Sequence, residues 1–82
     1  MSMVVLRLFA AAREAAGTGT DRIGGATVGE VLETAGRRYG DDFVAVLATS
    51  RVWVNGQPAA VEDAVVDGDE VAVLPPVSGG CS

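Results

Sequence analysis

Residues 27–40 read TVGEVLETAGRRYG, and this stretch predicts the helix around which the fold is built. Apolar side chains recur in it at steps of three and four, which is the spacing of one face of an α-helix. Thr27 and Glu30 match the capping-box pattern, in which the threonine accepts from a helical N–H and the glutamate reaches back. We therefore expect an amphipathic helix over residues 28–39, ended by Gly40. Its apolar positions are Val28, Val31, Leu32, Ala35 and Tyr39.

Short segments rich in branched apolar residues flank this helix and predict strands. The expected strands cover residues 3–9, 20–23, 51–54, 57–61 and 70–74. Gly24-Gly25 should end the second strand. Asn55-Gly56 predicts a hairpin, and Pro58 places the strand that follows it at a sheet edge.

Two further helical segments are expected, at residues 10–16 with Gly17 as the stop, and at residues 42–48. Strands on both sides of one central helix predict an α+β roll, in which a mixed sheet packs on one main helix. The length of 82 residues predicts one domain. We place this domain at residues 1–74 and a flexible tail at residues 75–82.

The composition excludes several classes of function. The chain has no His and one Cys, so neither a structural zinc site nor an internal disulfide is expected. The six basic residues, all arginines, are scattered through a chain of net charge −5, which argues against nucleic-acid binding. No membrane span or signal peptide is expected, so the predicted location is cytoplasmic. No bound cofactor is expected, and the inventory of side chains does not predict a self-sufficient enzyme.

The segment after Leu74 reads PPVSGGCS and predicts the working part of the molecule. Pro75 and Pro76 cannot continue a sheet ladder and favour an extended stalk. Gly79-Gly80 removes side chains and adds backbone freedom. By itself such a tail is equally typical of a frayed chain end.

Motifs along nearly the whole chain indicate what the tail does. They are FAAAREAAG at residues 9–17, Thr27-Val28, Val54-Asn55-Gly56, DGDEV at residues 67–71 and LPPVSGG at residues 74–80. With these motifs the sequence resembles the small subunit of molybdopterin synthase, within the ubiquitin-like sulfur carriers of the β-grasp fold. The FAAAREAAG segment favours the molybdopterin branch over the carriers of the thiamine pathway.

The resemblance implies a mechanism. An E1-like partner would use ATP to convert the Gly80 carboxylate into an acyl adenylate, and a sulfur donor would convert that into a thiocarboxylate. The tail, with Gly79 beside the reacting Gly80, would then enter the large subunit of the synthase. The resemblance leaves open a carrier for cysteine or another sulfur metabolite, a ubiquitin-like conjugating protein, and a non-catalytic interaction module.

Cys81 and Ser82 follow the second glycine, where members of this family usually end. Three explanations stay open: a protease removes both residues, the extension is accidental, or the protein has lost sulfur transfer and only binds. Gly80–Cys81 is also the bond formed when a carrier donates its acyl group to cysteine. A zinc metalloprotease of the JAMM type releases such adducts, so Gly80 and Cys81 form a candidate processing site.

The candidate partner-binding residues are Phe9, Trp53, Leu74, Pro75, Pro76 and Val77. Strand alternation places Val52 and Val54 on one face and Trp53 on the other. If the valines face the helix, Trp53 lies on the open face of the sheet, near Arg7 and Arg51, as an interface anchor. If the register is reversed, Trp53 belongs to the core. We favour the interface.

Overall fold

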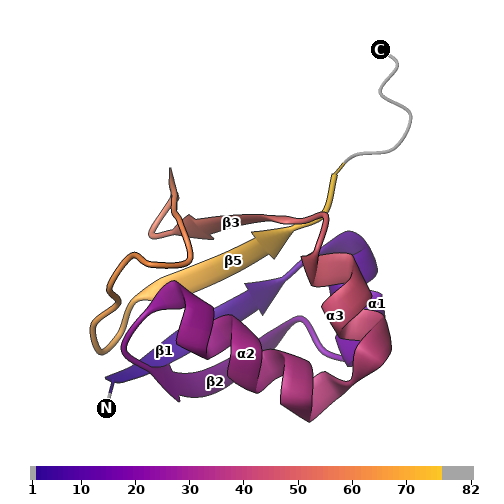
Figure 1. Cartoon of the computed structure of the whole chain (residues 1–82), viewed down its shortest axis with the longest axis horizontal. Coiled ribbons are helices and arrows are strands. Elements are labelled where there is room, and N and C mark those ends of the chain that lie inside the picture. The colour runs from indigo at the N-terminus through magenta and orange to yellow at the C-terminus, as the bar shows by residue number, and fades with distance from the viewer. Residues whose placement is uncertain (1, 77–82) are drawn as a thin grey trace.

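A computed structural model describes residues 2–76 of the chain. Five strands form one sheet in the order β2-β1-β5-β3-β4, and three helices lie against one of its faces (Figure 1). The strands are β1 (Ser2–Leu8), β2 (Thr20–Gly25), β3 (Arg51–Val54), β4 (Gln57–Pro58) and β5 (Glu70–Leu74). The helices are α1 (Ala10–Ala16), α2 (Val28–Tyr39) and α3 (Asp41–Leu47). The predicted α+β class and β-grasp architecture are thereby confirmed.

The core lies between the sheet and the helices. The central strands β1 and β5 run parallel, and each of the other pairings is antiparallel. Alternate residues of β1 and β5 point toward α2 and are almost completely buried, whereas their neighbours point away. The buried apolar residues are Val4, Leu6, Leu8, Ala12, Ile23, Val28, Val31, Ala35, Phe43, Val65, Val71 and Val73.

The start of α2 is capped as the sequence predicted, with one difference. Thr27 Oγ1 accepts from the N–H of Glu30 at 3.2 Å. The Glu30 carboxylate reaches back to the N–H of Ala26 at 2.9 Å, one residue before the cap itself. The first two helical N–H groups, at Val28 and Gly29, are free to bind elsewhere, since the first four N–H groups of a helix have no partner within it.

The segment after β4 supplies those partners, which corrects the predicted strand over residues 57–61. Only Gln57–Pro58 pairs with β3 as a named strand. The chain then crosses to the start of α2 (Figure 1), where the carbonyls of Asp63 and Val61 accept from the N–H groups of Val28 and Gly29 at 2.9 and 2.8 Å. The Ala59 N–H still donates to the Val52 carbonyl of β3 at 3.0 Å. The strand prediction was wrong after Ala59, because the carbonyls of Val61 and Asp63 cap a helix instead of continuing the ladder.

Two turns are tied together at the end of the sheet that lies away from Leu74. Asn55 and Gly56 have φ of 51° and 84°, the conformation that the hairpin prediction required. Asn55 Nδ2 donates to Asp69 at 2.9 Å, and Asn55 Oδ1 accepts from the N–H of Glu70 at 3.0 Å. The pKa of the Asp69 carboxyl lies below its usual value because it accepts from the N–H of Val66 and from Asn55. Sequence reasoning found both turns but not this connection.

Gly25 is the last residue of β2, so the strand includes both glycines and ends two residues later than the predicted end at Ile23. Gly25 pairs with Ser2 and is buried. A β-carbon at Gly25 would lie 2.9 Å from Val31 Cγ2 and 3.1 Å from the Val31 backbone nitrogen. The glycine therefore allows α2 to approach the strand closely, a role that the sequence alone does not indicate.

We expect Gly25→Ala to lower the free energy of unfolding by about 1–3 kcal/mol, because the added methyl must push α2 away from β2. Gly24→Ala, on the other face of the same strand, is the matched control and should change it much less. Urea denaturation of both variants measures the difference. Equal stability of the two variants would show that α2 does not pack this closely on Gly25.

Candidate docking face and tail root

The face of the sheet that the helices leave uncovered, here called the open face, carries the candidate docking residues. Cross-strand partners share a face, so the register defines its rows. One row joins Thr20, Arg7, Ala72, Trp53 and Pro58, and the next joins Arg22, Val5 and Glu70. Arg51 and Leu74 face each other in the row nearest the point where β5 ends.

Trp53 lies on the open face, half-buried, and its neighbours in β3 lie on the other side. Val52 and Val54 pack against the core, as the favoured register predicted. Trp53 pairs with Ala72, which in turn pairs with Arg7. The side chain borders a cavity of about 330 Å³. A large aromatic beside small neighbours is available for contact with a partner, although its role in binding stays a prediction.

Phe9 and Leu74 mark the root of the tail. The parallel strands β1 and β5 end side by side at this edge of the sheet (Figure 1). Phe9 is 40% exposed and Leu74 is 37% exposed. The chain bends away directly after Phe9, where Ala10 has a φ of 50°, an uncommon value for a residue with a side chain. Both apolar side chains are thus exposed where β5 leads out of the domain.

Positive charge is concentrated on the open face. It carries Arg7, Arg22 and Arg51, half of the six basic residues, but only Glu70 of the eleven acidic residues. Arg7 Nη1 pairs with Glu70 at 3.0 Å, and both side chains are half-exposed, so this pair adds little stability. Because all the other acidic residues lie elsewhere, the open face differs in sign from the rest of a net acidic protein.

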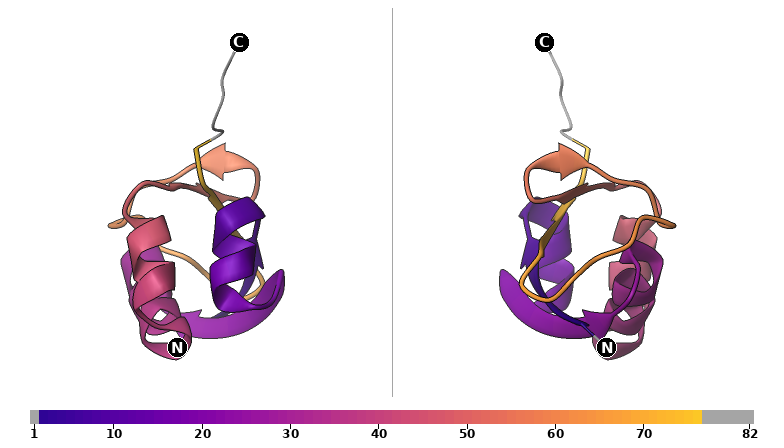
Figure 2. Two further views of the ribbon diagram at one scale, coloured as in Figure 1. Left: turned by 90° about the vertical axis from the view of Figure 1, so that its right-hand side faces the viewer. Right: turned by 90° about the vertical axis from the view of Figure 1, so that its left-hand side faces the viewer.

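The described part of the tail is its beginning. Pro75 is half-buried and Pro76 is exposed, and β5 leaves the domain at the end opposite Ser2 (Figure 2). The predicted binding residue Val77, the predicted reactive residues Gly79 and Gly80, and the predicted processing residue Cys81 lie outside the described residues. Their roles, and the flexibility expected of residues 75–82, stay predictions.

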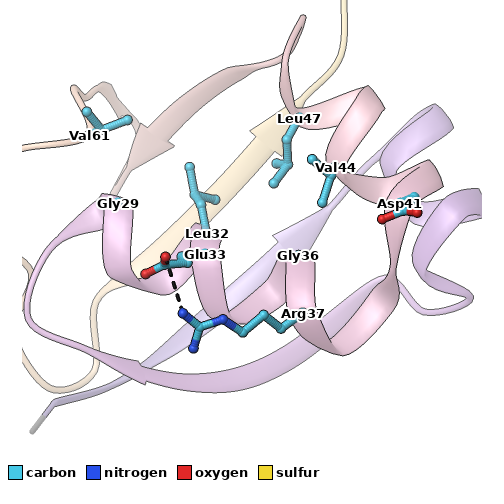
Figure 3. A pocket seen from close by; sticks show the side chains of 9 residues that line it. All are labelled: Gly29, Leu32, Glu33, Gly36, Arg37, Asp41, Val44, Leu47 and Val61. Carbon is cyan, nitrogen blue, oxygen red and sulfur yellow. Dashed lines mark ion pairs between the residues drawn. The ribbon is translucent and has the colours of Figure 1, made fainter.

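A second concave surface lies on the helical side and was missed by sequence reasoning. It is a groove of about 620 Å³ between α2 and α3 (Figure 3). Leu32, Val44 and Leu47 point toward it, and Val61 closes one end. Arg37 and Glu33 form an exposed ion pair of 3.3 Å along its rim. The groove is on the opposite side of the sheet from Trp53, so it is separate from the open face.

No cluster of three or more potential metal ligands occurs among residues 2–76. None of their helices has the length and apolar character needed to cross a membrane.

Comparison with known proteins extends these observations. The model of the ThiS family matches residues 6–80. Small archaeal modifier protein 1 of Haloferax volcanii is 40% identical, with 90% of this chain and 97% of that protein covered. The structure of a putative molybdopterin converting factor, subunit 1, from Pyrococcus furiosus has a TM-score of 0.83 and 28% identity over 94% of this chain and all of that one. The crystal structure of the BexX/CysO complex of Amycolatopsis orientalis contains a chain with a TM-score of 0.80 and 25% identity, over 94% of this chain and 99% of that one.

We expect Trp53→Ala to cost much less stability than the roughly 3–5 kcal/mol typical of a core tryptophan, because its ring lies on the open face. Leu6→Ala is the control, since Leu6 is fully buried on the other face of the same sheet, and should cost about 2–5 kcal/mol. Urea denaturation of both variants provides the comparison. A loss for Trp53→Ala as large as that for Leu6→Ala would place Trp53 in the core.

Proposed function

Because this chain belongs to the ThiS family of ubiquitin-like sulfur carriers, we propose that it carries sulfur as a thiocarboxylate on Gly80. We further propose that it serves as the small subunit of a molybdopterin-synthase-like complex. The observation that carries the proposal is the placement of the tail root. The central strand β5 delivers Leu74, Pro75 and Pro76 to the edge of the domain, next to the open face. A partner bound to that face is thus positioned to take the tail.

The chemistry follows from the weakness of a carboxylate as an acyl donor. An E1-like partner attaches the Gly80 carboxylate to the α-phosphate of ATP, and pyrophosphate leaves. Hydrosulfide supplied by a sulfur donor attacks the Gly80 carbonyl and displaces AMP, which leaves the thiocarboxylate. The large subunit of the synthase then takes the tail and holds its end in reactive geometry. The carrier has no cofactor of its own in this scheme, and ATP is bound by the activating partner.

Gly80 must first have a free carboxylate, and in the sequence it is joined to Cys81. We propose that a protease, with a JAMM-type metalloprotease as the candidate, hydrolyses the Gly80–Cys81 bond. Water adds its hydroxyl to the Gly80 carbonyl, and the amino group of Cys81 leaves with a proton. The product is a chain ending in Gly-Gly and the dipeptide Cys81-Ser82.

Two relatives favour other acceptors for the same activated tail. Similarity to small archaeal modifier protein 1 favours a protein modifier, in which an amino group of a target would attack Gly80. Similarity to the CysO-containing complex favours a carrier in another sulfur pathway. The chain has no lysine, so as a modifier it could not form lysine-linked chains on itself. All three proposed functions require activation of Gly80, and they differ only in the molecule that accepts the sulfur or the acyl group.

The positive charge and the Trp53 side chain of the open face favour a partner that has acidic groups around an apolar pocket for the Trp53 ring. Arg22 and Arg51 lie on this face without an ion pair to any residue of the described domain. Oppositely charged surfaces speed association and fix orientation, and salt weakens the effect. The acidic remainder of the protein would repel such a partner, so charge favours docking by the open face alone.

The first functional prediction concerns maturation. A chain that ends at Gly80, incubated with an E1-like enzyme, ATP and a sulfur donor, should gain the mass that corresponds to replacement of one oxygen by sulfur. The full-length chain should not, because its Gly80 carbonyl is part of a peptide bond. Intact-protein mass spectrometry measures both products.

The variant Gly80→Ala of the shortened chain is the control for the tail, since an added methyl at the reacting end should slow conversion and leave the melting temperature nearly unchanged. Conversion of the full-length chain with Cys81 and Ser82 still attached would contradict the processing step. Failure of the shortened chain with every E1-like enzyme of its own genome would contradict the carrier function.

The second functional prediction concerns the charge of the open face. Arg51→Glu should weaken binding to the E1-like enzyme by roughly tenfold at low salt, and the effect should shrink as salt is added. Arg37→Glu changes the net charge equally but lies beside the helical groove, so it is the matched control and should change binding little. Titration calorimetry at two salt concentrations tests this. Equal weakening by both variants would show that only net charge matters.

A further inference from the structure

The outer edge of β2 is the longer of the two free edges of the sheet. β2 has six residues, whereas β4 at the opposite edge has two and includes Pro58. A free edge presents N–H and carbonyl groups that can pair with a strand of another molecule. The six-residue edge of β2 is therefore the place where this domain is most exposed to unwanted strand addition.

The hydrogen bonds of β1 show which β2 groups point outward. Val5 donates its N–H to Asp69 at 2.8 Å and Met3 accepts from Gly68 at 3.0 Å, so both point toward β5. The alternate residues of β1 consequently pair with β2.

Those alternate residues lie opposite Asp21 and Ile23, which therefore point inward along the ladder. The outward row of β2 is accordingly Thr20, Arg22 and Gly24. Side chains bind the backbone groups at the first two of these positions.

At Arg22, two side chains bind the outward backbone groups. Asp21 Oδ1 accepts from the N–H of Arg22 at 2.7 Å. Arg38 Nη1, reaching over from α2, donates to the Arg22 carbonyl at 3.3 Å and to Asp21 Oδ2 at 2.7 Å. The Tyr39 hydroxyl donates to the same carboxylate oxygen. One ion pair thereby blocks both the donor and the acceptor that a new strand would need.

At Thr20, one hydroxyl binds both of the outward backbone groups. Thr18 Oγ1 donates to the Thr20 carbonyl at 2.9 Å and accepts from the Thr20 N–H at 3.4 Å. The outward N–H and carbonyl groups of Thr20 and Arg22 are thus all bound by neighbouring side chains.

We propose that Thr18, Asp21 and Arg38 close the β2 edge against strand addition, and that the partner they exclude is β2 of a second copy of this chain. Two copies of β2 can pair antiparallel about a two-fold axis, because each copy then offers the same outward donors and acceptors to the other. Occupied donors and acceptors cannot take part in that ladder, so the closed edge keeps the chain from pairing with itself.

The charges at the edge keep this closure in place at neutral pH. The hydrogen bond from Tyr39 foremost, with those from Arg38 and Arg22, holds the pKa of Asp21 below its usual value against the opposing effect of burial. Burial, together with the bond to Asp21, raises the pKa of Tyr39 to about 12. Asp21 therefore stays ionised and Tyr39 stays protonated, the states in which the cluster is hydrogen-bonded.

The test uses a variant with the edge opened, Thr18→Val/Asp21→Ala/Arg38→Ala. We expect it to shift from the monomer mass toward about twice that mass as its concentration rises, measured by light scattering after size exclusion. Glu33→Ala/Arg37→Ala is the matched control, because it removes an exposed ion pair from the same helix away from the edge. The control should stay monomeric like the parent chain.

A fourth substitution distinguishes edge pairing from general aggregation. Proline has no N–H and is tolerated at an edge where that N–H points to solvent, so adding Gly24→Pro to the opened variant should restore the monomer. If the triple variant fails to fold, as circular dichroism would show, Thr18→Val/Asp21→Leu/Arg38→Met replaces it, since it removes the same hydrogen bonds but keeps more of the side-chain volume. A folded opened variant that stays monomeric, or a dimer that persists with Gly24→Pro, would overturn the proposal.

Discussion

The parallel pairing of β1 with β5 is the constraint on which the rest of the structure depends. It joins the beginning of the chain to its end in the middle of the sheet, and the two strands supply Val4, Leu6, Val71 and Val73 to the core beneath α2. Because parallel strands end at the same edge, this pairing also sets the start of the tail beside Phe9. A pairing that stabilises the domain thus also determines where a reactive tail would emerge.

The sequence predicted those parts of the fold that depend on local pattern. The α2 helix was predicted over its observed range because its apolar spacing and the Thr27 cap are both local signals. Two predictions failed where distant segments decide the outcome. Val61 caps α2 through its carbonyl instead of extending a strand, and Gly25 belongs to β2, where its lack of a side chain leaves room for Val31. Both contacts depend on how separate segments pack together, so no local sequence pattern predicts them.

The features of the candidate site also divide into those that local sequence pattern predicts and those that depend on contacts between distant segments. Alternation was sufficient to place Trp53 opposite the core face, because the valines on either side of it identify the buried side. The same alternation placed Arg7 and Arg51 near Trp53, and the register of β1, β5 and β3 bears this out. Arg22 joins them on the open face through the pairing of β2 with β1, which only the structure shows. The groove between α2 and α3 likewise depends on how two helices pack.

The central claim is that partners approach the open face and the root of the tail. The most direct measurement is a two-dimensional NMR titration of the labelled chain, shortened to Gly80, with its E1-like enzyme. The account predicts that signals of Arg7, Trp53, Ala72 and Leu74 shift or broaden first, while those of Val44 and Leu47 in the helical groove change little. Changes confined to the groove between α2 and α3, with the open face unaffected, would contradict it.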